Sequence, residues 1–264
     1  MSKKKRIFIN ASTVLISGGL IVTQNIINAL IINNSFEILI TCPSYKPYKQ
    51  YATSTSRVIV VPQIMLNKIF RWYHDYIWLP LKIRRFDPSL VFTLSNIPAC
   101  TSYKQLYLHD NPYVTENFWP IKMPILAKIN HQVRKLVTYN RLKYVDHIIV
   151  QTSFQKHEFS RINKFEVPIS VVSPGIPIHL NANKSIQDIN LSKKYRRIAC
   201  ISRYFSHKNL EILYKAANYC AVNYLPIQFI LTISPTEDYY AKQLIKKIDI
   251  KYRQTGTIYS KMIN

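Results

Sequence analysis

The run Arg6–Ser12, RIFINAS, is followed by the tripeptide Ser17-Gly18-Gly19 and then by Leu20–Ile32, LIVTQNIINALII. The first run is rich in β-branched and aromatic residues and predicts a buried strand. The glycines indicate a turn, and the apolar residues of Leu20–Ile32 recur at helical spacing. Strand, turn and helix in this order form the first part of a βαβ unit, which favours a parallel sheet.

The same alternation continues along the chain, and strands that are nearly all apolar are typical of parallel sheets buried on both faces. Polar residues 181–194 interrupt it and predict a linker. We therefore expect an N-terminal domain over 1–190 and a shorter, incomplete α/β domain over 191–264. The expected strands are Phe36–Thr41, Val58–Val61, Leu90–Leu94, Gln105–Leu108, His147–Gln151, Ile169–Val172, Arg197–Ser202, Ile227–Ile233 and the start of one at Thr255–Ile258; the expected helices are Asn67–Phe86 with an interruption at Pro80, Met123–Tyr144, a short one from Ser153, Lys208–Val222 and Glu237–Ile248.

Composition excludes some classes of protein and leaves others open. The 264 residues are 48% hydrophobic, which is enough for a core and argues against intrinsic disorder. With 36 Lys and Arg against 13 Asp and Glu, the formal charge is +23. This charge favours anionic partners, and a nucleoside diphosphate or an anionic lipid surface fits better than a dedicated nucleic-acid role, because the basic residues form no long arm.

Targeting and redox signals point to the cytoplasm. The basic residues 3–6 precede an uncharged stretch as in an export signal, but asparagines interrupt it and no apolar block is long enough to span a membrane. The four cysteines, Cys42, Cys100, Cys200 and Cys220, lack CxxC and metal-ligand spacing, so we expect separate thiols and no metal site.

Three groups of residues are candidates for a binding or catalytic site. Gly18 and Gly19 lie where open α/β sheets bind ligands. The alternative is that they only form an ordinary turn between a strand and a helix. Arg203 and Lys208 lie between a strand and a helix of the second domain, a combination that suits a diphosphate. His109 ends a strand, where its polarity would face a cleft, although most such histidines bond the backbone.

Two further features have open interpretations. Asp110 follows His109 and either joins the same site or caps the turn at Asn111-Pro112. The most aromatic segment, Phe70–Trp78, is followed by Lys82, Arg84 and Arg85 and suits an interfacial helix and a core helix equally well.

Together these motifs resemble retaining glycosyltransferases of the GT-B fold, specifically glycosyltransferase family four. The other matching elements are Val145–Ser153 before a short helix, Ser173–Ile176 at the domain crossing, and Ser202-Arg203 with Lys208-Asn209. The resemblance implies two Rossmann-like domains and a nucleotide-sugar donor whose diphosphate is held by Arg203 and Lys208. Gly18 and Gly19 are expected to belong to the donor-binding residues and to position the donor sugar and the acceptor. It also implies a catalytic role for His109 near the transferred sugar, a glycan or lipid-linked acceptor in cell-surface polysaccharide synthesis, and no metal or other cofactor.

The sequence also departs from that family. Pro174 and Pro177 replace the usual residues at the domain crossing, and the family's glutamate pair is missing after Lys208. Glu158 and Glu166 have its spacing but precede Arg203, which we interpret as coincidence. We therefore expect an impaired transferase that contacts the membrane peripherally. The alternatives are a non-catalytic fragment or partner subunit with a companion chain, and a basic nucleic-acid-binding protein.

Overall fold

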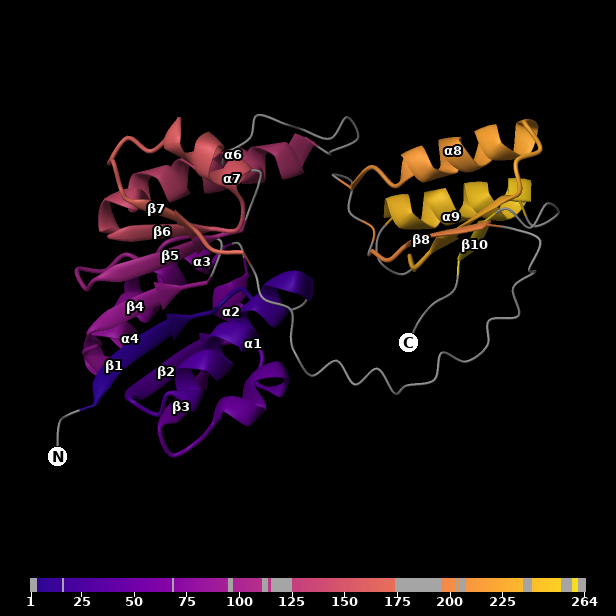
Figure 1. The fold of residues 1–264 in the computed structure, drawn as a ribbon. Coiled ribbons are helices and arrows are strands. Elements are labelled where there is room, and N and C mark those ends of the chain that lie inside the picture. Colours follow the sequence, from indigo (N-terminus) through magenta and orange to yellow (C-terminus); the bar gives the residue numbers. More distant parts are fainter. Residues whose placement is uncertain are drawn as a thin grey trace. The chain divides into compact units, whose positions relative to one another are not determined.

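The computed structural model describes residues 4–15, 17–67, 69–94, 97–110, 114, 125–173, 196–202, 204, 208–234, 239–252 and 258–260. These residues form two compact units, one within 4–173 and the other within 196–260 (Figure 1). The polar segment 181–194, predicted as a linker, lies outside the described residues.

The first unit is a seven-stranded parallel sheet in the order β3-β2-β1-β4-β5-β6-β7, with helices between its strands. The chain thus runs outward in one direction from β1, then returns and builds outward in the other from β4. The strands are β1 Lys5–Asn10, β2 Phe36–Cys42, β3 Ser56–Val60, β4 Leu90–Thr93, β5 Gln105–His109, β6 His147–Val150 and β7 Ile169–Val171; the helices are α1 Ser17–Ile32, η1 Lys46–Tyr51, α2 Gln63–Leu66, α3 Arg71–Tyr73, η2 His74–Trp78, α4 Leu79–Phe86, α6 Ile125–Arg141, η3 Leu142–Tyr144 and α7 Ser153–Ser160.

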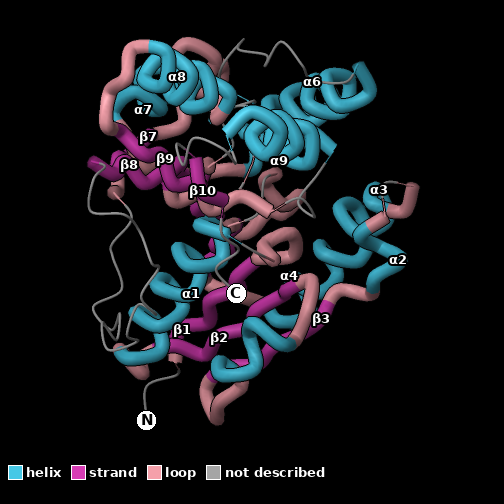
Figure 2. Tube along the Cα trace, turned by 90° about the vertical axis from the view of Figure 1, so that its right-hand side faces the viewer, coloured by secondary structure: helices cyan, strands magenta, loops and turns pink. Residues whose placement is uncertain are grey.

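Alternation along β1 buries both faces of this sheet. Ile7 and Ile9 join a core cluster with Ile27 of α1, whereas Phe8 packs in a second cluster with Ile83 of α4. Successive side chains of a strand point to opposite faces, so α1 and α4 cover opposite sides of the sheet (Figure 2). The prediction of a strand buried on both faces is confirmed.

The second unit is a three-stranded parallel sheet in the order β10-β9-β8. Its own core contains Phe229 and Leu231 of β9, packed with Ala217 and Leu244 from the two helices. The elements are β8 Arg196–Cys200, α8 Glu211–Val222, β9 Ile227–Leu231, α9 Tyr239–Tyr252 and β10 Ile258–Ser260.

Two sequence predictions differ from the observed elements. The glycines predicted as a turn lie inside α1, which begins at Ser17, because helical φ and ψ are open to glycine as to any residue. The interruption predicted at Pro80 is instead a π-helical turn, η2, just before it. Pro80 lies in the first turn of α4, where proline needs no hydrogen-bond partner for the N–H that it lacks.

Candidate functional site

The first unit has a topological switch point between β1 and β4, because the strand order reverses there. Asn10, the last residue of β1, is in register with Thr41 of β2 on one side and with Thr93 of β4 on the other. All three polar side chains are buried. Open α/β sheets bind ligands just outside the carboxyl ends of strands at such a point, so this edge is the first candidate site.

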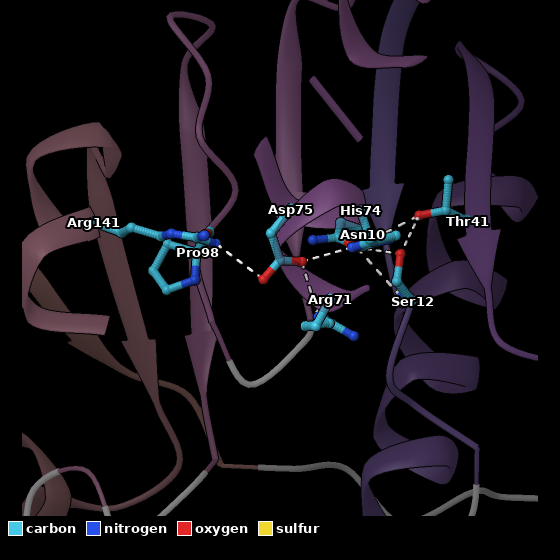
Figure 3. Close-up of polar contacts among 8 residues, drawn as sticks. All are labelled: Asn10, Ser12, Thr41, Arg71, His74, Asp75, Pro98 and Arg141. Atoms are coloured by element: carbon cyan, nitrogen blue, oxygen red, sulfur yellow. Dashed lines mark hydrogen bonds and ion pairs between the residues drawn. The ribbon is translucent and has the colours of Figure 1, made fainter. Parts of the chain in front are cut away.

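A hydrogen-bond network fixes the chain where it leaves β1 (Figure 3). Ser12 donates from Oγ to Oδ1 of Asn10 at 2.7 Å and from its backbone N to the same atom at 3.3 Å. Its Oγ also lies 3.0 Å from Oγ1 of Thr41. These bonds tie the carboxyl ends of β1 and β2 together and orient Ser12 just beyond β1.

Gly19 and Asp110 come together beside the N-terminus of α1. A Cβ added to Gly19 would lie 3.5 Å from Oδ2 of Asp110, whereas one added to Gly18 would meet nothing within 4 Å. Burial raises the pKa of Asp110, and a backbone hydrogen bond only partly opposes it. A carboxyl group with a raised pKa at this edge suits hydrogen bonding to a hydroxyl better than binding of a second anion.

His109 lies in the core and not at an open surface. The residue is 0% exposed, and its Nδ1 lies 3.1 Å from Oη of Tyr107. Its ring packs edge-on against that of Phe159 of α7, with 4.8 Å between the ring centroids. The prediction that its polarity faces a cleft is wrong in this unit. As the last residue of β5, His109 lies on the same strand face as Tyr107, two residues earlier, and Tyr107 packs with Phe159 of α7 in one core cluster.

In the second unit, Lys208 lies at the carboxyl end of β8. Its Nζ donates to Oγ of Ser202 at 2.9 Å, and the side chain is exposed. Thr232, which follows β9, holds the same loop through a 2.9 Å bond from the backbone N of Ser202. The ammonium group is therefore anchored at the edge where parallel sheets bind ligands. Arg203 lies outside the described residues.

A buried ion-pair network centres on Asp75 of η2 (Figure 3). Oδ1 accepts from Nδ1 of His74 at 2.6 Å and from Nε of Arg71 at 2.9 Å, and Oδ2 lies 3.5 Å from Nη1 of Arg141. Burial alone would raise the pKa of Asp75, but the His74 hydrogen bond and the charges of Arg71 and Arg141 outweigh it and lower the pKa. Asp75 is therefore ionised at neutral pH.

The aromatic segment divides between core and surface. His74 is buried and stacks on Trp78 at 5.4 Å, whereas Trp72 is 58% and Tyr76 56% exposed. Both open interpretations of this segment thus apply, each to different residues. None of the described helices is long and apolar enough to cross a membrane.

Sequence reasoning did not find the polar cluster at β1 or the network around Asp75. The pairing of Asp75 with Arg141 spans 66 positions, and no local pattern indicates it. An Asn at the end of a strand and a Ser two residues later are a signal that could have indicated the β1 cluster. Within the described part of the chain, no group of three or more His, Cys, Asp or Glu residues is placed to hold a metal ion, and the four cysteines are free thiols.

Comparisons with known proteins match the fold and not the sequence. No protein-family model and no curated protein matches the chain. Among solved structures, sucrose-phosphate synthase from Thermosynechococcus elongatus aligns with a TM-score of 0.68 and 13% identity over 98% of this chain and 70% of its own. A glycosyltransferase from Rickettsia africae ESF-5 aligns with a TM-score of 0.66 and 14% identity over 100% of this chain and 69% of its own.

A third similar structure belongs to another class of enzyme. A protein from Listeria monocytogenes, assigned as a UDP-N-acetylglucosamine 2-epimerase, aligns with a TM-score of 0.58 and 10% identity over 100% of this chain and 70% of its own. At such identities the likeness concerns the fold. Two Rossmann-like α/β units in one chain, aligned over nearly all of its length, show that this protein has the GT-B fold.

Proposed function

We propose that this protein is a glycosyltransferase that moves a sugar from a nucleotide-sugar donor to a glycan or lipid-linked acceptor. A fold hosts many activities, so the function is inferred from the residues of the site. The observation that carries it is Lys208, an exposed cation anchored to Ser202 at the carboxyl end of β8. In this proposal Lys208 and Arg203 contact the donor diphosphate and stabilise the negative charge that develops as it leaves.

The first unit would receive the acceptor. Its switch point presents Gly19 and the Asp110 carboxyl group, which can accept a hydrogen bond from an incoming hydroxyl. His109 would act indirectly: its packing on Phe159 would position the end of β5 and thereby Asp110. Gly18, which has no neighbour within 4 Å of an added Cβ, leaves space for the donor sugar. Transfer with retention at the sugar and a role in cell-surface polysaccharide synthesis belong to the same proposal.

Two further details belong to this proposal. The exposed rings of Trp72 and Tyr76 favour an acceptor presented at a membrane surface, because amphipathic aromatic side chains suit that interface. The two cations of the second unit, Arg203 and Lys208, would neutralise the charge of the diphosphate in place of a divalent metal ion. We therefore expect turnover to persist when metal ions are removed with EDTA.

The experiment measures release of nucleoside diphosphate from a panel of nucleotide-sugars by the full chain. We expect Lys208→Ala to lower turnover about a hundred-fold, because one charge-assisted contact to the developing charge is lost. Lys215→Ala is the matched control, since Lys215 is an exposed lysine of α8 away from the strand ends, and it should leave turnover unchanged. Equal turnover in Lys208→Ala and the parent chain would contradict the assigned role.

The third similar structure makes the product analysis decisive. An epimerase changes the configuration of its nucleotide-sugar, whereas a transferase releases the nucleotide and makes a new glycosidic bond. Recovery of an epimerised nucleotide-sugar and no free diphosphate would contradict the proposed transferase. Free diphosphate that increases when an acceptor is added would support it.

A further inference from the structure

A cleft of about 470 Å³ in the first unit contains an excess of positive charge. Arg71 and Asp75 line it from the α3–η2 segment, Arg134 and Arg141 from α6, and Thr13 from the loop after β1. This volume falls within the range of small-molecule sites, which is about 300–1,000 Å³. The cleft is distinct from the Lys208 site, which belongs to the second unit.

The charges in this cleft do not balance. Asp75 is the one acidic residue among its described lining residues, and it already pairs with Arg71 and Arg141. No described carboxylate lies within ion-pair distance of Arg134. Two guanidinium groups therefore share one carboxylate, and the third, that of Arg134, has none among the described residues. Arg134 is exposed to solvent, yet partial desolvation lowers its pKa and the like charge of Arg71 lowers it further.

Hydrogen-bonding capacity is also left over. Arg141 is 4% exposed, yet its Nε makes no hydrogen bond with the described residues, and neither does the buried Oγ1 of Thr13. Buried polar atoms in proteins nearly always have a partner, so these two atoms in one cleft indicate a ligand with acceptor groups. Arg71 pairs with Asp75 through Nε, which leaves its two terminal nitrogens outside that ion pair.

The position of the cleft relates it to the proposed reaction. Thr13 follows the carboxyl end of β1, one residue after the Ser12 that is bonded to Asn10 and Thr41. A ligand in the cleft would therefore extend toward the switch point, where we place the acceptor hydroxyl. The amide of Asn130 adds a neutral hydrogen-bonding group of the kind that sugar hydroxyls use.

We propose that this cleft binds an anionic group of the acceptor, a phosphate or a carboxylate, through Arg71, Arg134 and Arg141. Planar guanidinium groups match both anions in geometry, and the excess charge would be balanced only when such a group is bound. This inference rests on the proposed function only in identifying the ligand as the acceptor. The anion-binding property itself belongs to the first unit alone.

The test measures binding directly, without catalysis. The probes are glucose 6-phosphate, glucuronate and glucose, titrated into the full chain by calorimetry at constant ionic strength. We expect at least one anionic sugar to bind at least ten-fold more tightly than glucose, and the tighter of the two identifies phosphate or carboxylate as the recognised group. Equal binding of all three probes, or no binding, would overturn the proposal.

Matched variants separate a site from general charge. Arg134→Gln removes a lining arginine outside the Asp75 network and should weaken the anionic probe about ten-fold, because a charged hydrogen bond is lost. Lys128→Gln removes one charge from the same helix outside the cleft and should leave binding unchanged. Equal loss in both variants would mean that the charge acts nonspecifically and would overturn the site.

A third variant keeps this inference distinguishable from the proposed function. Lys208→Ala leaves the cleft intact, so it should bind the anionic probe as the parent chain does. If no nucleotide-sugar is turned over by the parent chain while Arg134→Gln loses probe binding, the proposed function fails and the anion site stands; if Lys208→Ala retains full donor turnover, only the role assigned to Lys208 fails. If donor turnover depends on Lys208 and no anionic sugar binds, only the inference about the cleft fails.

Discussion

Asp75 shows how burial changes what an ion pair contributes to stability. Its partners His74 and Arg141 have side chains that are 0% and 4% exposed. Glu158 has similar neighbours, His157 and Arg161, but those side chains are 74% and 68% exposed. Removing one partner of a buried network leaves a charge that water cannot reach, whereas an exposed pair is replaced by solvent.

We therefore expect Asp75→Asn to lower the free energy of unfolding by about 3 kcal/mol. Glu158→Gln, the matched control, should lower it by less than about 1 kcal/mol. Both values can be measured by denaturant unfolding at neutral pH. Similar effects of the two substitutions would contradict the role given to burial.

The same comparison has a defined pH dependence. Because the pKa of Asp75 is lowered in the folded state, the unfolded chain binds more protons between the two pKa values, and this contribution to stability rises with pH there. The stability difference between the parent chain and Asp75→Asn should be complete above about pH 5 and should shrink as the pH falls below about 4. A difference that stays constant down to pH 2 would contradict this assignment.

Helix α1 carries two glycines in its first turn, where the structure gives no steric reason for them. An added Cβ at Gly19 would make only ordinary contacts, at 3.5 Å to Asp110 and 3.9 Å to Val14, and one at Gly18 would make none. Glycine weakens a helix relative to alanine. We therefore infer that these glycines leave room for a ligand to approach the backbone at the start of α1.

Gly18→Ala and Gly19→Ala should each raise the free energy of unfolding by up to about 1 kcal/mol. If a substrate approaches this backbone, the same variants should lose donor or acceptor turnover although they are more stable. Ala29→Gly, at an exposed position of the same helix, is the reverse control and should lower stability without changing turnover. Full turnover in both alanine variants would remove the glycines from the site.

The π-helical turn η2 explains why a polar network could form within an amphipathic segment. The extra residue in this turn lies directly before α4, whose Leu79, Ile83 and Phe86 pack in the core. Such a turn shifts the side chains before it relative to the face that follows. His74 and Asp75 thus point inward, while Trp72 and Tyr76 stay exposed.

The molecule as a whole contains separate hydrophobic cores in its two units. Ile9 is buried with residues of the first unit, and Phe229 with residues of the second. A unit with its own core can unfold by itself, so one transition is not expected to describe this chain.

We expect calorimetry to show two transitions. Ile9→Ala and Phe229→Ala should each destabilise one unit by about 3 kcal/mol and leave the other transition in place. Ile32→Ala, at a side chain that is 83% exposed, should shift neither. A single transition that moves equally in both core variants would show that the units unfold together.

The amino-acid sequence by itself determined the elements and their parallel pairing, because the spacing of apolar residues along RIFINAS and the strands after it is a local property. It also placed Lys208 correctly beyond a strand end, since that follows from the order of elements alone. Burial of His109 against Phe159, the approach of the Asp110 carboxyl group to Gly19, and the pairing of Asp75 with Arg141 were decided only by the tertiary structure. Each of these three features brings together residues that are far apart in the chain. Which distant residues meet depends on how the helices pack on the sheet.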